Sequence, residues 1–489
     1  MFKSQYNQDK YCYETYLNQL PTPGVFVEVG ASNGIKHSNT YFYEKSLNWS
    51  GLCIEPRENV YDDLLKNRDC FCEQIGIAPE YEEDVDFLEI TGWGEGLSGI
   101  VRNYNPQHKH IVDNHIEKHE LNEGMKHIKI KTCPLQVLLD KYVIKHINFI
   151  TVDTEGGELN ILKTIDWDKT TIDVLSVENN YNSNTYFRDY LEGKGFMFSK
   201  KLEIDEVYVH KTFIQKQHIN VLFTSPWATP TEMLKEYSVM LPDGKTWRNL
   251  RGTDNPDEAD VCVLIEGASN PNIYSMDPNK LICFPREPYS LKPVKQYDAY
   301  NLPHAYSYDT IYHCVPQFNF LKMGINELLS LQYPFKYSNA SCIVSMRTHT
   351  NGSRARLSFL DMVMKKYPDC MQVFGKGTNE IDSKISGLLP FKYSLCMENS
   401  QQNNYFTEKF TDAIVCWSIP IYWGCPNISE YFPNDSYHYI DITQPDAPEQ
   451  LIKIISQPIT RDNIIALIHA RNLIFSEYNI WSTVRMLTK

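Results

Sequence analysis

Residues 390–426 place charged and polar side chains at spacings that suit a phosphorylated ligand. The apolar run at residues 393–397 predicts a buried strand, residues 406–417 predict a helix, and residues 419–423 predict a second strand. In a parallel sheet this order puts the intervening loop at the carboxyl edge, where α/β proteins bind ligands. The N–H groups at the helix start and Lys409 would then form a seat for a diphosphate. The alternative is a capped helix with a Glu–Lys pair on its surface.

This stretch resembles the donor-binding motif of the family 10 glycosyltransferases, the α1,3/4-fucosyltransferases. The resemblance is carried by Glu398-Asn399, by Tyr405-Phe406-Thr407-Glu408-Lys409 and by Ile419-Pro420-Ile421-Tyr422-Trp423-Gly424. It implies a GT-B fold of two Rossmann-like lobes with GDP-fucose as the donor. It also implies a donor-binding set, which comprises Arg356, Asn399, Tyr405, Thr407, Glu408 and Lys409.

Two residues take their roles from this resemblance alone. The family places an arginine at a helix start against the donor diphosphate. Arg356, at the start of a helix predicted over residues 356–366, aligns best, and Arg354 is a possible substitute; a guanidinium suits bidentate phosphate contact better than an ammonium. The general base of the family is a glutamate in a turn after a strand, which implies that Glu287 is catalytic. A glutamate before a proline is also consistent with a simple exposed turn, and Glu266 is the alternative base.

The first half of the chain has a glycine turn suited to a nucleotide cofactor. A strand predicted over residues 25–29 runs into Gly30-Ala31-Ser32-Asn33-Gly34. The G-x-x-x-G spacing differs from that of a dinucleotide site, and an acidic residue two positions before the first glycine is typical of S-adenosylmethionine sites. Glu55 follows the next predicted strand, where it is placed to hydrogen-bond ribose hydroxyls. If this is a cofactor site, the residues predicted to bind the cofactor are Glu28, Gly30, Ala31, Asn33, Gly34 and Glu55. The alternative is that the two glycines only form a tight turn.

A pair of carboxylates follows the strand predicted over residues 147–152. Because parallel strands end at the same sheet edge, Asp153 and Glu155 should stand over the edge that carries the glycine turn. A carboxylate there could orient an acceptor hydroxyl, take its proton or anchor the amino group of the cofactor, so both are catalytic candidates. Glu178, which closes another predicted strand, is a weaker candidate. The alternative is that these acids only complement the dipole of a helix beginning near Glu158.

Four motifs, at residues 4–9, 27–34, 54–56 and 150–159, occur in the order seen in FkbM-type methyltransferases. In the last motif, Asp153, Glu155 and Glu158 fit the family pattern D-x-E-G-x-E. Glu28 departs from the family, in which aspartate is common at this position. The resemblance covers about residues 2–212. It implies a Rossmann-like methyltransferase that uses S-adenosylmethionine.

Composition narrows the classes of function. A chain of 489 residues with 42% hydrophobic and 22% charged residues is typical of a globular protein with roughly two to four domains. A net charge of −14 argues against a nucleic-acid partner. We see no apolar run that could span a membrane and no signal peptide, and the 13 scattered cysteines suit reduced thiols. We therefore expect a cytoplasmic protein.

The sequence predicts no obligatory metal. No pair of CxxC motifs is present, and no Asp-x-Asp clamp stands at a predicted strand end. His115 and His119 are four residues apart, but the glutamate that a zinc protease needs between them is shifted by one position, to Glu117. A lid or an acceptor-side loop is the preferred interpretation of residues 108–119.

These observations predict an α/β fusion of two enzymes. Residues 1–212 would form the methyltransferase domain, residues 218–335 the acceptor-binding lobe of the glycosyltransferase, and residues 336–489 its GDP-sugar-binding lobe, with C-terminal helices over residues 461–487. The predicted function has two parts. One is transfer of fucose to a glycan or glycoconjugate, with inversion and in an α1,3-type linkage; the other is O-methylation of a sugar hydroxyl, which we expect to lie on the added fucose. A transferase for another GDP-sugar and a catalytically dead carbohydrate-binding scaffold are the alternatives. The sequence leaves the oligomeric state open.

Overall fold

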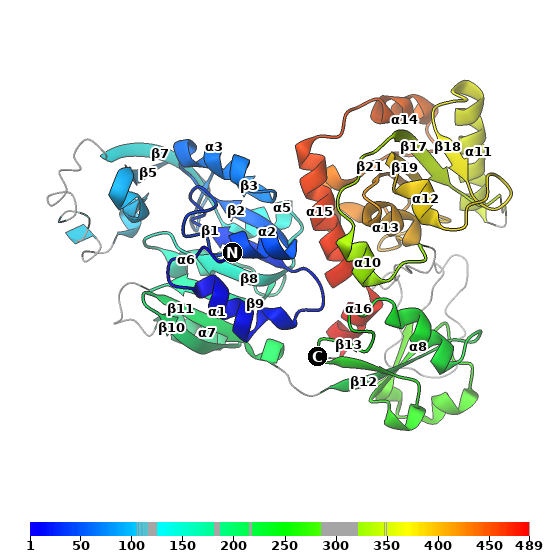
Figure 1. Cartoon of the computed structure of the whole chain (residues 1–489), viewed down its shortest axis with the longest axis horizontal. Helices are drawn as coiled ribbons and strands as arrows, with labels where there is room; N and C mark the ends of the chain where they lie inside the picture. Colours follow the sequence, from blue (N-terminus) through cyan, green and yellow to red (C-terminus); the bar gives the residue numbers. More distant parts are fainter. Residues whose placement is uncertain are drawn as a thin grey trace. The chain divides into compact units, whose positions relative to one another are not determined.

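The computed structural model describes residues 1–104, 125–179, 186–214, 218–284, 321–346 and 350–488, with isolated positions 106, 109, 110, 112, 114 and 348. The chain divides into two compact units, Met1–Gln215 and Lys216–Lys489. Both units have the predicted mixed α/β architecture, in which helices pack on central sheets (Figure 1). Among the described residues, no helix combines the length and the apolar character that crossing a membrane would require.

The first unit is built on a seven-stranded sheet of order β10-β11-β9-β8-β1-β2-β3. Neighbouring strands are parallel, except that β11 runs antiparallel to both β9 and β10. The chain moves outward from β1 to β3 and then returns to β8 on the other side of β1, so the switch point of the sheet lies between β1 and β8. The strands are β1 (Val25–Val29), β2 (Ser50–Ile54), β3 (Phe71–Glu73), β8 (His146–Val152), β9 (Thr171–Glu178), β10 (Phe196–Leu202) and β11 (Asp205–His210).

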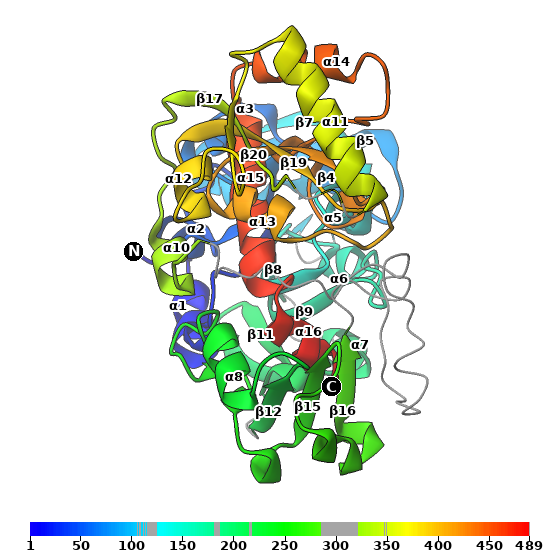
Figure 2. The same ribbon diagram turned by 90° about the vertical axis from the view of Figure 1, so that its right-hand side faces the viewer.

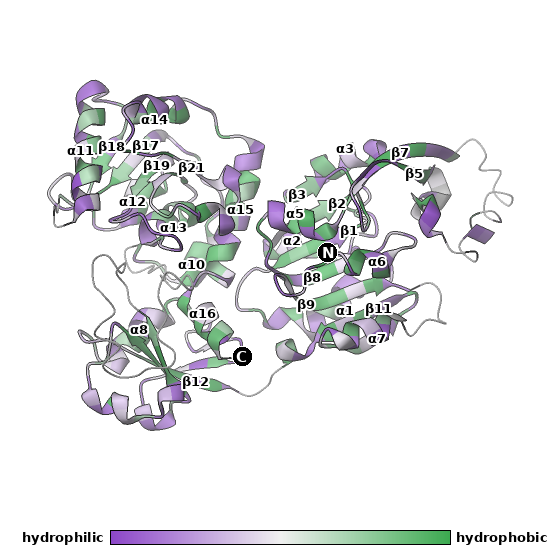
Figure 3. Ribbon diagram, turned by 180° about the vertical axis from the view of Figure 1, so that it is seen from behind, coloured by the Kyte–Doolittle hydropathy of each residue, from purple (hydrophilic) through white to green (hydrophobic). Residues whose placement is uncertain are grey.

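The central strands of this sheet are buried on both faces, which explains their continuous apolar runs. Along β1, Val25, Val27 and Val29 pack in one core, and Phe26 packs in the core on the opposite face. Figure 3 shows this apolar character along the strands of the sheet. The helices of the unit are α1 (Gln8–Thr15), α2 (Tyr41–Leu47), α3 (Glu58–Asn67), α5 (Leu135–Lys141), α6 (Glu158–Leu162) and α7 (Tyr186–Gly193).

A smaller sheet of order β4-β7-β5-β6 is inserted between β3 and β8. Its strands are β4 (Gly76–Ile77), β5 (Glu82–Ile90), β6 (Gly99–Ile100) and β7 (Met125–Cys133), and a 3-10 helix, η2 (Gly92–Leu97), joins β5 to β6. Val85, Phe87, Ile100 and Ile130 form its small core. This sheet was not predicted from the sequence. The two histidines weighed as a metal pair, His115 and His119, lie outside the described residues.

The second unit contains two five-stranded sheets, of order β13-β14-β12-β15-β16 and β18-β17-β19-β20-β21. In the second sheet every neighbouring pair is parallel, and the order reverses between β17 and β19. The first sheet consists of β12 (Ile219–Thr224), β13 (Thr246–Trp247), β14 (Leu250–Thr253), β15 (Val261–Ile265) and β16 (Leu281–Phe284). The second consists of β17 (Ser338–Ile343), β18 (Gln372–Phe374), β19 (Phe391–Met397), β20 (Ile419–Trp423) and β21 (His438–Tyr439).

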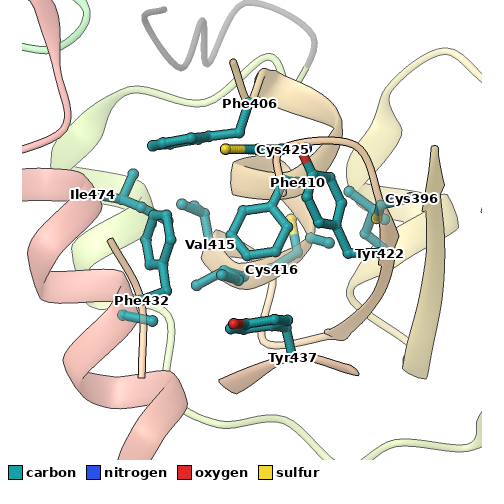
Figure 4. Packing of buried hydrophobic residues seen from close by; sticks show 14 of the residues in the cluster. Cys396, Phe406, Phe410, Val415, Cys416, Tyr422, Cys425, Phe432, Tyr437 and Ile474 are labelled. Atoms are coloured by element: carbon teal, nitrogen blue, oxygen red, sulfur yellow. The ribbon is translucent and has the colours of Figure 1, made fainter. Parts of the chain in front are cut away.

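The helices of the second unit join its two sheets around one hydrophobic core, part of which is drawn in Figure 4. The predicted C-terminal helix pair is present as α15 and α16. α15 packs against α13, whereas in α16 Trp481 donates a hydrogen bond to the carbonyl of Tyr237 at 3.0 Å. The helices are α8 (Pro230–Ser238), α10 (Ile325–Ser330), α11 (Asn351–Lys366), α12 (Lys384–Leu388), α13 (Glu408–Val415), α14 (Ala447–Ile455), α15 (Arg461–Ser476) and α16 (Ile480–Leu487).

One predicted helix boundary is wrong. The helix expected over residues 356–366 begins five residues earlier, at Asn351. The Thr350 side chain accepts a hydrogen bond from the N–H of Ser353 at 3.0 Å and so caps the helix. Arg356 therefore lies in the second turn of α11 rather than at its first residue.

Candidate functional site

The first unit has a cavity of about 270 Å³ at the carboxyl edge of its large sheet. Its walls come from the loops after β1 and β8, the strands that flank the switch point, from the loop after the neighbouring strand β2, and from the inserted sheet. Of the residues predicted to bind a cofactor or to act in catalysis in this unit, those lining it are Glu28, Gly30, Ala31, Glu55, Asp153 and Glu155. The structure thus brings together residues that lie far apart in the sequence.

The glycine turn approaches the end of β8 very closely. Gly30 has φ +90°, and a Cβ atom there would stand 1.8 Å from the carbonyl oxygen of Asp153. The two strand ends are also linked by a hydrogen bond from the Asp153 N–H to the Val29 carbonyl, at 3.1 Å. Position 30 therefore accepts only glycine, because a side chain would push β1 and β8 apart.

Asn33 and Gly34 do not line the cavity. The Asn33 side chain accepts hydrogen bonds from the N–H groups of Ile35 and Lys36, at 3.1 and 3.0 Å, and so closes the turn. Gly34 has φ +78° and lies against Leu64 and Arg68. In the structure both residues shape the turn, and a direct role in cofactor binding stays a prediction.

The two acidic residues predicted to contact the cofactor are engaged with the protein itself. Glu28, 3% exposed, accepts hydrogen bonds from Ser38, Asn39, Thr40 and Arg68. These bonds hold residues 38–40 against the cavity wall.

Glu55 is likewise engaged: it accepts hydrogen bonds from the Ser32 N–H at 2.9 Å and from Nε of Arg57 at 2.8 Å. It therefore joins the glycine turn to the end of β2. Both carboxylates nevertheless face the cavity.

Asp153 and Glu155, which line the cavity, form a carboxylate cluster with Glu178, and the ligand oxygens all lie within 4.8 Å of one another. Burial, reinforced by the charges of Asp205 and Glu158, raises the pKa of Asp153 to about 7. Burial and the neighbouring carboxylates also raise the pKa of Glu155 and of Glu178 well above the ordinary value. A carboxylate that titrates near neutral pH can take a proton from a hydroxyl group. Three oxygens this close could also hold a cation, so the expected absence of a metal stays a prediction.

The cavity has an apolar end that the sequence analysis missed. Ile75 and Ile77 from the region of β4, with Phe87, Ile100 and Ile130 from the inserted sheet, line it. At the polar end, Gln5 from the N-terminal segment and Asn39 are further wall residues. The apolar periodicity of residues 85–90 was a detectable signal for a strand. Its position over the glycine turn was not, because it depends on tertiary packing.

In the second unit, the predicted donor residues gather at the switch point between β17 and β19. The helices that follow these strands, α11 and α13, both begin at this carboxyl edge. A Cβ atom on Gly352, in the first turn of α11, would lie 2.0 Å from the carbonyl oxygen of Asn399, in the loop after β19. Two helix N-termini, each with N–H groups outside the helical hydrogen-bond pattern, therefore meet at one place, which favours binding of an anion.

Arg356 is buried at this point, 5% exposed. Its Nη1 atom donates to Oδ1 of Asn399 at 2.6 Å, and within the described part of the chain its Nε–H has no hydrogen-bond partner. Burial lowers the pKa of Arg356 despite the nearby charge of Glu398. Arg354, the substitute candidate, instead donates to the Thr348 carbonyl at 3.0 Å and is exposed. The geometry favours Arg356 over Arg354.

The remaining motif residues form an ion-pair network at the start of α13. Thr407 caps the helix. Its N–H and its hydroxyl each donate a hydrogen bond of 2.8 Å to the fully buried carboxylate of Glu398. The Lys409 ammonium lies 3.4 Å from Glu398 and 3.6 Å from Glu408. The Tyr405 side chain is buried beside this network at 2% exposure. Glu398, although quoted in the motif, was not in the predicted site set.

The predicted general base, Glu287, lies outside the described residues, so its role stays a prediction. Glu266, the alternative base, follows β15 with a left-handed backbone at φ 59°. Its N–H donates to the carbonyl of Phe284, the last residue of β16, at 2.9 Å. Glu266 therefore stands at the carboxyl edge of the first sheet of this unit.

Known protein families match one segment in each half of the chain. Residues 28–198 match the family described as "Methyltransferase FkbM domain", and residues 336–463 match "Glycosyltransferase family 10 (fucosyltransferase) C-term". An alpha-(1,3)-fucosyltransferase of Helicobacter pylori is 40% identical over 57 residues, which is 12% of each protein. An alpha-(1,4)-fucosyltransferase of Arabidopsis thaliana is 26% identical over 122 residues, 25% of this chain and 27% of the relative. These curated relatives are thus matched over only a fraction of their length.

Two solved structures resemble parts of the chain at low scores. An alpha1,3-fucosyltransferase aligns with a TM-score of 0.35 and 18% identity, over 52% of this chain and 82% of its own. The FkbM methyltransferase from Methylobacillus flagellatus aligns with a TM-score of 0.23 and 15% identity, and the alignment covers 41% of this chain and 50% of the methyltransferase. The assignment therefore rests on the two sequence-family matches. The chain carries an FkbM methyltransferase domain followed by the C-terminal domain of a family 10 glycosyltransferase.

Proposed function

We propose that the chain is a bifunctional glycan-modifying enzyme. Its second unit transfers fucose from GDP-fucose to a glycan acceptor with inversion, in an α1,3-type linkage. Its first unit methylates a sugar hydroxyl, on the newly added fucose, using S-adenosylmethionine. The domain limits proposed for the two activities are residues 1–212 for the methyltransferase and residues 218–489 for the glycosyltransferase, with its lobes meeting near residue 335.

The observation that supports the glycosyltransferase half is the environment of Arg356. Arg356 is 5% exposed and its Nε–H has no hydrogen-bond partner among the described residues, which calls for an explanation, since buried donors are nearly always satisfied. The partner of its Nη1 atom, Asn399, follows Glu398, which Lys409 contacts, and a diphosphate bound at this edge would supply the missing acceptor atoms. A nucleoside diphosphate is therefore the ligand class that this site fits best.

In the proposed reaction, the acceptor oxygen attacks the anomeric carbon as the bond from that carbon to the diphosphate breaks. Glu287 takes the proton of the acceptor hydroxyl, by the role that the family resemblance gives it. Arg356 and Lys409 stabilise the negative charge that develops on the departing GDP. Asn399, Tyr405 and Glu408 would hold hydroxyl groups of the donor.

The cavity of the first unit fits S-adenosylmethionine. Its apolar end suits an adenine ring, and the backbone at Gly30 leaves room that a side chain would fill. Its polar end, at Glu28 and Asn39, suits the amino acid part of the cofactor. When bound, the cofactor supplies a methyl group on a positively charged sulfur. Asp153 takes the proton from the acceptor hydroxyl, since its pKa of about 7 makes it a base near neutral pH.

One chain carrying both sites favours a shared glycan. Tethering raises the effective concentration of one site for the product of the other, to about the millimolar range for a short flexible connection. Methylation of the fucose just added uses this proximity directly. Methylation of the acceptor before fucosylation is the competing order.

Binding measurements on the full chain test both halves. GDP and S-adenosylhomocysteine should each bind with 1:1 stoichiometry in calorimetry, and a panel of GDP-sugars should show hydrolysis of GDP-fucose above all others. Preference for another GDP-sugar would change the donor that we propose, and absence of all binding would favour a catalytically dead carbohydrate-binding scaffold.

The order of the two reactions is tested with a variant that lacks sugar transfer. A Lys409→Ala chain should methylate a pre-fucosylated glycan but not the same glycan without fucose. Methylation of the unfucosylated glycan alone would reverse the order.

A further inference from the structure

A lysine outside the donor motif enters the ion-pair network of the second unit. Lys384 is the first residue of α12, which packs beside α13 (Figure 2). Ser383 caps this helix by accepting the Ile385 N–H at 3.3 Å, and its hydroxyl donates to the Leu321 carbonyl at 2.7 Å. The start of α12 is therefore anchored on two sides, which fixes the position of Lys384.

The Lys384 ammonium lies between two carboxylates on one face of α13. Its Nζ atom is 2.8 Å from Oδ2 of Asp412 and 3.7 Å from Oε1 of Glu408. Glu408 and Asp412 are four residues apart, so they occupy neighbouring positions on the helix surface. Asp412 is 1% exposed, and the Lys384 side chain is 18% exposed. This is a largely buried ion pair rather than a solvated surface contact.

The charges at this edge need Lys384 for balance. The acidic groups are Glu398 after β19 and Glu408 and Asp412 on α13; the basic groups are Arg356 on α11, Lys409 on α13 and Lys384 on α12. Lys409 contacts both Glu398 and Glu408. Without Lys384, Lys409 would be the only ammonium group close to these three carboxylates among the described residues.

We propose that Lys384 is a positioning residue of the donor site: anchored on Asp412, its ammonium group holds the Glu408 carboxylate in place at the start of α13. This inference rests on the proposed donor function and extends it to a residue that the donor motif does not contain. The geometry agrees with the electrostatics. Burial alone would raise the pKa of Glu408, but the charges of Lys409 and Lys384, with hydrogen bonds from the helix backbone and from Thr407, lower it to about 2.

A purely structural ion pair is the competing explanation, and a double-mutant cycle separates the two. The variants are Lys384→Met, Glu408→Gln and the double variant of the full chain, with GDP-fucose affinity at pH 7.5 measured by calorimetry. Lys384→Met alone should weaken GDP-fucose binding by about tenfold, the loss expected when a charged contact is removed. In the Glu408→Gln background the same change should have less than about a threefold effect, because Lys384 acts through Glu408.

The pH dependence gives a second readout. Burial raises the pKa of Asp412 to about 6, so the pH comparison uses chains that carry Asp412→Asn. In that background Lys384→Met should raise the pKa of Glu408, so GDP-fucose affinity should fall between pH 7.5 and pH 5, whereas the affinity of the chain that keeps Lys384 should stay level. Lys384→Arg should restore both properties. Lys366→Met, which removes a lysine from an exposed ion pair with Glu449 in the same lobe, is the matched control and should behave as wild type. If Lys384→Met does not fold, Lys384→Gln replaces it in the cycle.

Additive losses in the cycle, or a lower melting temperature with unchanged GDP-fucose affinity, would show that Lys384 is only structural. Failure of the proposed donor function looks different, since the wild-type chain would then bind neither GDP nor GDP-fucose.

Discussion

Arg356 and Asn399 join two segments of the second unit across the switch point of its sheet. The Nη1 atom of Arg356, on α11, donates to Oδ1 of Asn399, in the loop after β19, at 2.6 Å. The bond holds a buried guanidinium against the loop that leads from β19 to α13. Asn399 therefore orients the arginine as well as being a candidate donor ligand in its own right.

Replacing Arg356 by lysine should weaken GDP binding although the charge is kept. Lysine cannot reach Asn399 and a phosphate with the same planar fork, so we expect about a tenfold loss of GDP affinity in calorimetry. Arg354→Lys is the matched control, because Arg354 is exposed and contacts the Thr348 carbonyl. Equal losses in the two variants would contradict the assignment of Arg356.

Lys409→Ala should abolish sugar transfer and leave the methyltransferase site intact. Removing a charged contact to the leaving diphosphate costs about 2–4 kcal/mol of transition-state stabilisation in comparable sites. GDP-fucose turnover should fall accordingly, and S-adenosylhomocysteine affinity should match that of wild type. Near-normal fucose transfer would remove the basis for the donor site.

Gly30→Val should eliminate S-adenosylmethionine binding. The new Cβ would overlap the Asp153 carbonyl oxygen, and valine strongly disfavours the φ of +90° found here. Gly193→Val is the control, because a Cβ there has nothing within 4 Å and its φ lies outside the left-handed region. Calorimetry with S-adenosylhomocysteine, and melting curves to show that the variant is folded, measure the effect. Unchanged affinity in a folded Gly30→Val chain would mean that the cofactor binds elsewhere.

The rate of methyl transfer should rise with pH through about 7. Asp153 acts as a base only when it is deprotonated, and its pKa is raised to about 7, so the active form grows as the pH increases from 6 to 8. Asp153→Asn should lower the rate by about 100-fold or more and remove this dependence, while cofactor affinity is kept. A wild-type rate that is level over this range would assign the proton transfer to another group.

Local spacing in the sequence predicts much of the donor site. The strand, loop and helix around Glu408 form as expected, since apolar runs and a capping threonine act over a few residues. The same holds for the strand before Gly30. The start of α11 was predicted five residues too late, because the first turn of the helix is polar and has few apolar residues to show helical periodicity. The cap at Thr350 therefore looked like part of a polar loop.

Tertiary packing decided what each site residue does. The sequence by itself determined that glycine stands at position 30 and that carboxylates follow two strands. Only the fold brings the Asp153 carbonyl against Gly30, gathers Asp153, Glu155 and Glu178 into one cluster, and turns Glu28 inward to four donors. The place of Lys384 beside Glu408 depends on how α12 packs on α13. Such contacts join residues distant in sequence, and the free energy that selects them comes from burial of the whole core rather than from local spacing.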